Sequence, residues 1–221
     1  MTIERLSLFN TENIGVYARA NNSCVFVPAG LGRMFSELIG SKTGIDTVEL
    51  ELGGISATGI MIACNDNGVI LPYNASEEAV SAIRNRGLNY HVSKSRVNAL
   101  GNLLAANSKV CFASPILGHP LLKAVEDTLD VEVVATTVAG LTTVGSSLAL
   151  NNKGFVCNPE TSDEEFELIK NRSGLSGSRV TVNGGYPYVR SGMVFNDHFV
   201  LVGKLSTGVE LAEIESGLGL V

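Results

Sequence analysis

The sequence predicts an α/β protein built as a propeller of five repeated units around a pseudo-fivefold axis. One observation is a pattern that recurs five times, and the clearest copy runs from Gly59 to Pro72. In that copy an apolar run, Asn65, a second apolar run and a proline follow one another. Two short strands joined at an Asn-containing turn are typical of such a segment.

The other copies lie at a regular spacing along the chain. They occupy 15–28, 101–115, 145–159 and 190–203, and the last of these begins with Arg190 instead of Gly and ends with Gly instead of Pro. The turn asparagines of successive copies are separated by 44, 42, 44 and 45 residues. A period of this length indicates a repeat architecture.

The two ends of the chain together make up one repeat. Arg190 is followed by 31 residues, and the first 15 residues of the chain bring the length to 46, about one period. The N-terminal segment 3–9 is therefore predicted to supply the last strand of the fifth unit. A ring closed in this way leaves no sheet edge unpaired. We expect one domain, 1–221, with units over 14–58, 59–100, 101–144, 145–189, and 190–221 joined to 1–13.

Each unit is predicted to run strand, strand, helix, strand. In unit one a short helix over 31–39 is expected to end at Gly40, and the alternation of apolar residues and acids over 47–52 predicts the third strand. In unit two a helix begins after Ser76, a capping residue followed by two acids, and 88–92 is the third strand.

The three remaining units show the same order. In unit three Pro120 suits the first turn of a helix, and 131–136 reads as a strand. In unit four the segment 162–165 has the residues and spacing of a capping box, and 179–182 reads as a strand. In unit five the capping box recurs at 207–210.

Composition excludes several classes of protein. A formal net charge of −6 argues against a surface that binds free nucleic acid non-specifically. The longest apolar runs have the length of strands, so no membrane span is predicted. Cysteines at 24, 64, 111 and 157 never form a CxxC pair, and we expect buried, reduced thiols in a cytoplasmic protein.

The sequence gives little support for catalysis or metal binding. His91, His119 and His198 fall in three different units without metal-ligand spacing, so surface or capping histidines are expected and no metal or cofactor is predicted. A catalytic cysteine would be a singular departure from the repeat. Four thiols in four successive hairpins instead indicate small core residues.

The turn asparagines have two interpretations. Asn tolerates left-handed turn geometry and bonds its own backbone, which is a purely structural role. Alternatively, the turns and the polar residues at the starts of the inner strands form a recognition surface. The predicted contact residues are Asn65, Asn102, Ser146, Ser147, Asn151 and Arg190.

Segments in all five units resemble the archaeal form of the family of the sixth translation initiation factor. They are 13–15, 65–72, 96–102, 137–139, 144–146, 192–197 and 210–215. The resemblance covers essentially the whole chain and implies the pentein fold, a five-unit α/β propeller. The chain departs from its own repeat at Arg190, where the other four units carry glycine.

The resemblance implies a non-catalytic, monomeric factor without cofactors. It implies that the protein binds the large (50S) ribosomal subunit and sterically prevents its association with the small (30S) subunit. The implied partner is mainly a ribosomal protein of the L14 type near the sarcin–ricin loop, with no membrane and no free nucleic acid involved. An acidic disc suits a basic ribosomal protein better than bare RNA.

The alternative is a pentein enzyme that modifies guanidino groups. Such hydrolases and amidinotransferases resemble this chain in fold and use a cysteine nucleophile together with a histidine and acidic residues. No cysteine follows Cys157, which excludes a nucleophile late in the chain.

Overall fold

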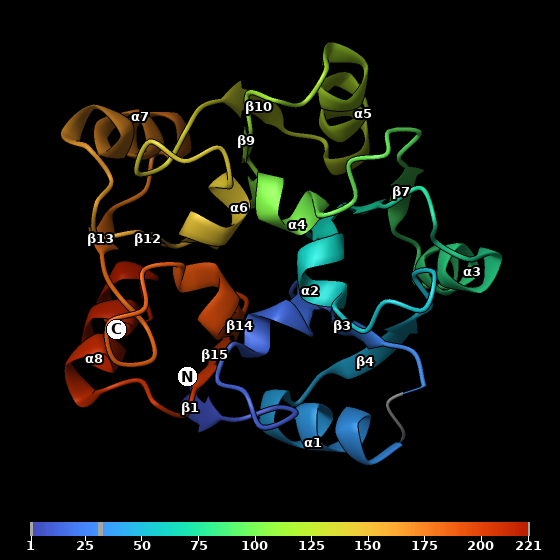
Figure 1. Ribbon diagram of the computed structural model, residues 1–221, viewed down its shortest axis with the longest axis horizontal. Helices are drawn as coiled ribbons and strands as arrows, with labels where there is room; N and C mark the ends of the chain where they lie inside the picture. The colour runs from blue at the N-terminus through green and yellow to red at the C-terminus, as the bar shows by residue number, and fades with distance from the viewer. Residues whose placement is uncertain (1, 31–32, 221) are drawn as a thin grey trace.

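Five three-stranded sheets stand around a central axis, with the long helices at the rim (Figure 1). The computed structural model describes residues 2–30 and 33–220. In each sheet the middle strand pairs antiparallel with an inner strand and parallel with an outer strand. Inner strands of neighbouring units contact one another around the axis. The predicted five-unit α/β propeller of strand–strand–helix–strand repeats is confirmed.

The strands of the five units have the following bounds. The inner strands are β2 (Arg19–Ala20), β5 (Ala63–Cys64), β8 (Leu104–Ala106), β11 (Leu148–Leu150) and β14 (Met193–Phe195). The middle strands are β3 (Cys24–Pro28), β6 (Gly68–Leu71), β9 (Val110–Ala113), β12 (Phe155–Cys157) and β15 (Phe199–Gly203). The outer strands are β4 (Asp46–Leu50), β7 (Asn89–Val92), β10 (Glu132–Ala135), β13 (Gly177–Arg179) and β1 (Thr2–Leu6).

Two sets of helices complete the units. The outer helices are α1 (Arg33–Thr43), α3 (Glu77–Asn85), α5 (His119–Leu129), α7 (Asp163–Ser173) and α8 (Gly208–Gly217). A short helix precedes each inner strand: η1 (Ile14–Val16), α2 (Thr58–Met61), α4 (Leu100–Leu103), α6 (Val144–Ser147) and η2 (Val189–Gly192). Four of the outer helices, α1, α3, α5 and α7, each connect two parallel strands, as a βαβ crossover requires, and α8 follows β15 as the last element.

The N-terminal strand closes the ring. β1 pairs in parallel with β15, and the register runs from Thr2 opposite Phe199 to Leu6 opposite Gly203. The last unit therefore takes two strands and a helix from the C-terminal end and its outer strand from the N-terminal end, as predicted. Every unit thereby has a complete sheet and two neighbours.

The hydrophobic core is divided into five clusters, each lying between two neighbouring units. In the cluster between units one and two, Phe26 and Leu50 of one sheet meet Ile62 and Leu71 of the next, and Ile83 of α3 covers them. The same construction joins the fifth unit to the first, where buried residues of β1, β15, β3 and α1 form one cluster. Burying a large aliphatic or aromatic side chain contributes about 1.5–3 kcal/mol, so the seam has the same kind of support as the other junctions.

The start of each repeat differs from the prediction. The apolar run before each turn asparagine was expected to be one strand, but its first half is a short helix and the inner strand has only two or three residues. The five helices converge on the axis, and each leading glycine rests against a carbonyl oxygen of the preceding helix. A Cβ on Gly59 would collide with Gly15 O, and one on Gly145 would collide with Gly101 O. This close approach explains the glycine six residues before four of the five asparagines; the fifth unit carries Arg190 at that position.

Three element bounds also differ. Helix α1 continues through Gly40 to Thr43, and the predicted first residue, Leu31, lies outside the described residues. The outer strand of unit four spans Gly177–Arg179 instead of 179–182. The outer strand β1 ends at Leu6 because a turn with positive φ at Phe9 and Asn10 follows it.

Alanine at position 101 is expected to destabilise the protein strongly. Its Cβ would lie 2.5 Å from both Gly59 O and Ile62 O, and both are backbone atoms that cannot move without shifting the ring. We expect Gly101→Ala to lower the free energy of unfolding in urea by about 3 kcal/mol or more, the upper range for overpacking. Gly208→Ala is the matched control, since a Cβ at that position would meet no atom of the described residues within 4 Å, and it should leave stability unchanged or slightly raised. Equal stability of the two variants would contradict this packing.

Candidate functional site

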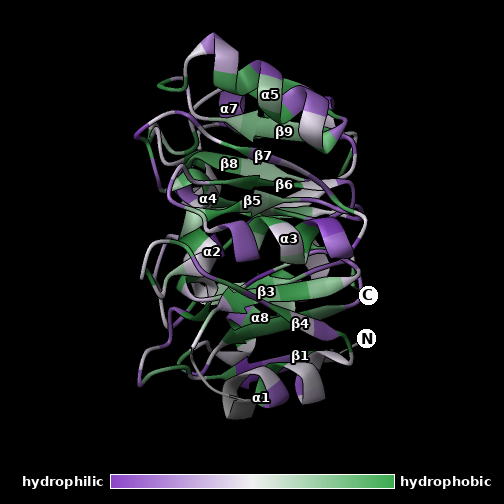
Figure 2. Cartoon of the chain, turned by 90° about the vertical axis from the view of Figure 1, so that its right-hand side faces the viewer, coloured by the Kyte–Doolittle hydropathy of each residue, from purple (hydrophilic) through white to green (hydrophobic). Residues whose placement is uncertain are grey.

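The disc has two faces of different construction. The helical face carries the five short helices and the loops that precede them, 7–13, 51–57, 93–99, 136–143 and 180–188. The hairpin face carries the five turns between inner and middle strands, 21–23, 65–67, 107–109, 151–154 and 196–198. Figure 2 shows α2 and α4 on one side of the disc and both termini on the other. Middle strands run from the hairpin face to the helical face, so outer helices begin on the helical face.

The five turn asparagines form a closed circle of hydrogen bonds around the axis. Each side-chain amide donates to the backbone carbonyl of the next asparagine in the ring. The N···O distances are 3.1 Å (Asn21 to Asn65), 3.0 Å (Asn65 to Asn107), 2.9 Å (Asn107 to Asn151), 3.2 Å (Asn151 to Asn196) and 3.0 Å (Asn196 to Asn21). Each side-chain oxygen accepts from two backbone N–H groups of its own turn. We call these five side chains the amide circle. They provide hydrogen-bond partners for backbone N–H and C=O groups of the five turns that meet at the axis.

Two of the predicted contact residues belong to the amide circle. Asn65 and Asn151 are each only 5% exposed. Their amides also donate to carbonyls at the ends of outer helices, Asn65 to Leu129 O at 2.8 Å and Asn151 to Leu218 O at 3.1 Å. Both side chains are thus fully engaged within the fold on the hairpin face, away from the other four candidates.

The other four candidates lie together on short helices of the helical face. Asn102 is in α4, Ser146 and Ser147 are in α6, and Arg190 is in η2; α6 contacts both of the other helices. Asn102 is half-buried, and no side-chain hydrogen bond holds it among the described residues. The other three are buried. Asn102 therefore presents the most surface of the four.

Each buried member of this group has a different environment. Ser146 Oγ donates to Thr143 O at 2.9 Å. Ser147 is completely buried, and its Oγ has no hydrogen-bond partner among the described residues. The Arg190 guanidinium donates to Met193 O at 2.6 Å and lies 5.2 Å from the centre of the Phe195 ring.

The loops of the helical face turn sharply at pairs of residues with positive φ. These pairs are Phe9–Asn10, Gly53–Gly54, Ala139–Gly140 and Asn183–Gly184. Two successive left-handed residues are the mark of type I′ turns, which normally select glycine or asparagine. An aromatic residue such as Phe9 rarely adopts this conformation. The loops are therefore fixed turns with defined side-chain directions.

Glu210 anchors one of these loops to an outer helix. As the third residue of α8 it completes a capping box with Thr207, and its carboxylate accepts from Thr207 N at 2.7 Å. It also accepts from Thr181 Oγ1 at 2.7 Å, Gly185 N at 2.9 Å and Gly184 N at 3.1 Å. Burial alone would raise the pKa of Glu210, but these hydrogen bonds to the charged form lower it to about 2.

Glu165 repeats this arrangement in unit four. It closes the predicted capping box with Ser162 at the start of α7. Its carboxylate accepts from Thr137 Oγ1 at 2.6 Å, Ala139 N at 2.9 Å and Gly140 N at 3.0 Å. The capping boxes predicted from sequence are confirmed, and they have the further task of fixing the loops of the helical face.

Exposed apolar side chains concentrate on the helical face. Of the large apolar residues exposed among the described side chains, most lie in its loops or in first turns of outer helices: Phe9, Ile55, Tyr73, Val97, Ile116, Tyr186, Leu205 and Val209. The others are Leu38 in α1 and Tyr90 in β7. None of these eight was predicted from the sequence. Four of them, Phe9, Ile55, Val97 and Tyr186, lie in loops that separate the repeats, and the other four lie between a middle strand and an outer helix or in the first turn of α8. Contiguous exposed apolar groups characterise interaction surfaces.

The outer helices give the two faces different charge. Acids occupy the first turns, at the helical face: Glu77, Glu78, Asp163, Glu164, Glu165 and Glu210. Basic residues occupy the last turns, at the hairpin face: Lys42, Arg84, Lys170 and Arg172. This distribution suits the helix dipoles, and it also makes the rim of the helical face acidic. Lys94 and Arg96 in loop 93–99 are local basic exceptions.

The described residues offer little for catalysis or metal binding. All four cysteines are free and buried, as predicted, and burial raises the pKa of the Cys24 and Cys157 thiols to about 11 and that of Cys111 to about 12. Within 2–30 and 33–220, no group of three or more histidine, cysteine or acidic side chains is placed to hold a metal ion. No helix in that part of the chain is long and apolar enough to cross a membrane.

Comparison with known proteins places this chain in a family. The model of the eIF-6 family matches residues 3–217. The chain belongs to the eIF-6 family. Translation initiation factor 6 of Staphylothermus marinus is 36% identical over 222 residues, which cover 99% of this chain and 98% of that protein. The protein of the same name from Pyrococcus horikoshii is 32% identical, with full coverage of both chains. This eIF-6 chain is therefore a translation factor.

Solved structures support the pentein fold of this eIF-6 chain. A dimethylarginine dimethylaminohydrolase, crystallised as an adduct with S-methyl-L-thiocitrulline, superimposes with a TM-score of 0.51. The alignment covers 93% of this chain and 74% of the hydrolase at 13% identity. At such low identity the likeness concerns the fold alone.

Replacing the Glu210 carboxylate is expected to destabilise the protein in a pH-dependent way. An unfolded glutamate titrates near pH 4.3, above the folded pKa of about 2, so the stabilisation is fully present above about pH 4.3 and is lost as the pH falls toward 2. Glu210→Gln should cost about 1–3 kcal/mol in urea unfolding at pH 7 and progressively less below pH 4. Glu213→Gln, on an exposed position of the same helix, is the control. A cost for Glu210→Gln that stays constant from pH 7 to pH 2.5 would contradict the role of the carboxylate.

Proposed function

We propose that this protein binds the large (50S) ribosomal subunit and sterically prevents its association with the small (30S) subunit. The observation that carries the proposal is the gathering of exposed apolar residues on one face of a member of the eIF-6 family. Surfaces of this kind, rich in aromatic and aliphatic groups, are typical of binding sites for large partners.

We assign the contact to the helical face. Its loops carry the exposed side chains of Phe9, Ile55, Val97 and Tyr186, which come from four units. Exposed acids in the first turns of α3 and α7 lie on the same face. An acidic rim around an apolar centre complements a basic ribosomal protein, and this supports a partner of the L14 type near the sarcin–ricin loop. The hairpin face, with its basic helix ends, suits such a partner less well.

The six residues predicted from sequence take different roles in this proposal. Asn102 contacts the partner directly, since it is the most accessible of them on the helical face. Ser146, Ser147 and Arg190 shape the same region from below the surface. Asn65 and Asn151 act at a distance, because their amides hold the ring on which the loops are mounted.

A rigid disc bound to the large subunit can prevent subunit association sterically, without catalysing a reaction. The closed ring, the five inter-unit cores and the carboxylate-anchored loops fix the helical face before binding. Little conformational entropy is then lost on association, which favours tight binding. The bound disc blocks joining by its volume alone, so the proposal requires no cofactor, no oligomer and no active site, and it acts in the cytoplasm where ribosomes assemble.

A bulky cation at position 102 is expected to weaken binding to the large subunit. Asn102→Arg would introduce a long charged side chain into an interface with a basic partner, where steric overlap and like charge both oppose contact. We expect affinity for purified 50S subunits, measured by co-sedimentation, to fall at least about tenfold, which corresponds to about 1.4 kcal/mol. The urea midpoint should not change.

The matched control makes the same substitution on the opposite face. Asn85 is exposed at the end of α3, so Asn85→Arg should bind the subunit like the unaltered protein. If Asn85→Arg weakened binding and Asn102→Arg did not, the contact would belong to the hairpin face. Absence of binding by the unaltered protein would refute the proposed function itself.

A further inference from the structure

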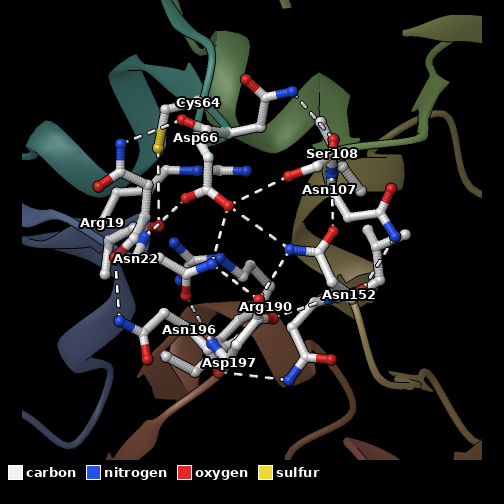
Figure 3. Close-up of a pocket in the computed structure, with 18 of the residues that line it drawn as sticks. Arg19, Asn22, Cys64, Asp66, Asn107, Ser108, Asn152, Arg190, Asn196 and Asp197 are labelled. Atoms are coloured by element: carbon white, nitrogen blue, oxygen red, sulfur yellow. Dashed lines mark hydrogen bonds between the residues drawn. The ribbon is translucent and has the colours of Figure 1, made fainter. Parts of the chain in front are cut away.

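Two arginines are buried beside the axial cavity of the ring. Arg19 and Arg190 are each 5% exposed, although they come from opposite ends of the chain. Both line a cavity of about 40 Å³, which Figure 3 shows together with the turn residues around it. Neither arginine fits the repeat: three of the other units carry alanine at the position of Arg19, and all four others carry glycine at the position of Arg190. Both arginines therefore depart from the repeated sequence pattern of the propeller.

The partners of both guanidinium groups are neutral. Arg19 donates to the carbonyl oxygens of Gly101 at 3.2 Å, Leu104 at 3.3 Å and Gly59 at 3.5 Å. Arg190 donates to the Met193 carbonyl, and its guanidinium lies over the Phe195 ring. Within 2–30 and 33–220, no carboxylate lies within 4 Å of either guanidinium.

The acidic groups nearest the cavity are already engaged. Asp66 and Asp197 line the cavity from the hairpin turns, and each accepts hydrogen bonds from the side chains of both Asn22 and Asn152. Cys64 also lines the cavity, but burial raises the pKa of its thiol, which keeps it neutral at pH 7.

Two buried guanidinium groups therefore face the cavity, and no carboxylate of the described residues lies within 4 Å of either. Burial lowers the pKa of both arginines, and the positive charge of Arg19 lowers the pKa of Arg190 further. Arginine nonetheless stays protonated in proteins, so it cannot relieve this cost by losing a proton as lysine would. Buried charges are ordinarily paired, and five N–H donors on each guanidinium exceed the carbonyl acceptors present here.

We propose that the axial cavity binds one small monovalent inorganic anion, chloride in solution, between the guanidinium groups of Arg19 and Arg190. The cavity volume of about 40 Å³ exceeds the roughly 10–15 Å³ that one water molecule needs by the same measure, so there is room for a monatomic anion. The anion neutralises part of the charge at the axis and so stabilises the closed ring. The anion site does not require that the protein bind the ribosome, although Arg190 also lies beneath the helical face.

Anion-dependent stability tests the site in solution. The folding equilibrium constant is measured by urea unfolding at constant ionic strength while sodium chloride replaces sodium gluconate. Because only the folded state binds the anion, a tenfold rise in chloride above the dissociation constant should raise the folding constant about tenfold. Arg190→Met, which keeps a long side chain over Phe195, should abolish this dependence. Arg172→Met, at an exposed ion pair on the hairpin face, should retain it. Equal chloride dependence in all three proteins would overturn the proposal.

Bromide diffraction tests the same site without relying on a variant that folds. Crystals of the unaltered protein grown in sodium bromide, without chloride, should give an anomalous peak between the Arg19 and Arg190 guanidinium groups. The expected peak lies within hydrogen-bonding distance of both. Bromide peaks confined to the surface, with ordered water alone in the axial cavity, would refute the anion site.

Discussion

Five chain turns meet at one axis, and the polar backbone groups there must find partners in a space that admits few water molecules. The amide circle solves this problem with one residue type used five times. Each asparagine side chain accepts from its own turn and donates to the next unit. Because an unpaired buried backbone group costs about as much as a lost hydrogen bond, the circle couples formation of each turn to the presence of its neighbour. Ring closure and turn geometry thus depend on one interaction.

Contacts further from the axis also join neighbouring units. On the helical face the short helices pack glycine against carbonyl oxygen, so neighbouring units are fixed at backbone contact. Between the units, each outer helix covers the junction of two sheets, and the seam between β1 and the first unit has the same kind of apolar cluster as the others. At the surface, Glu165 and Glu210 tie the loops to the helices. Contacts at the short helices, between the sheets and in the surface loops therefore all fix the geometry of the helical face.

The repeat and its closure could be predicted from the sequence because they leave local signals. Asparagine at a fixed period, a glycine six residues earlier and capping boxes at Ser162 and Thr207 each have one physical reason to stand where they do. The short helices could not be predicted in this way, because so short a run of apolar residues suits a strand equally well. Their conformation is set by contact with neighbouring units that are about 44 residues away in sequence.

The candidate site was harder to predict for the same reason. A turn asparagine in an exposed hairpin looks accessible in sequence, yet Asn65 and Asn151 are buried by neighbours from other units. Arg19 gave no local signal at all, since its partners Gly59, Gly101 and Leu104 belong to the second and third units. Asn102 was found because it adjoins the leading glycine, whose position on the helical face follows from the repeat. The apolar loops became visible only when the fold placed them side by side.

The measurement that tests the account most directly is the joining of ribosomal subunits. Purified 50S and 30S subunits are mixed on a sucrose gradient with and without this protein at a one-to-one ratio to the large subunit. The account predicts that the protein migrates with the 50S fraction and that the peak of joined ribosomes is lost. Joined ribosomes in undiminished amount, with the protein either carried along in them or left at the top of the gradient, would contradict it.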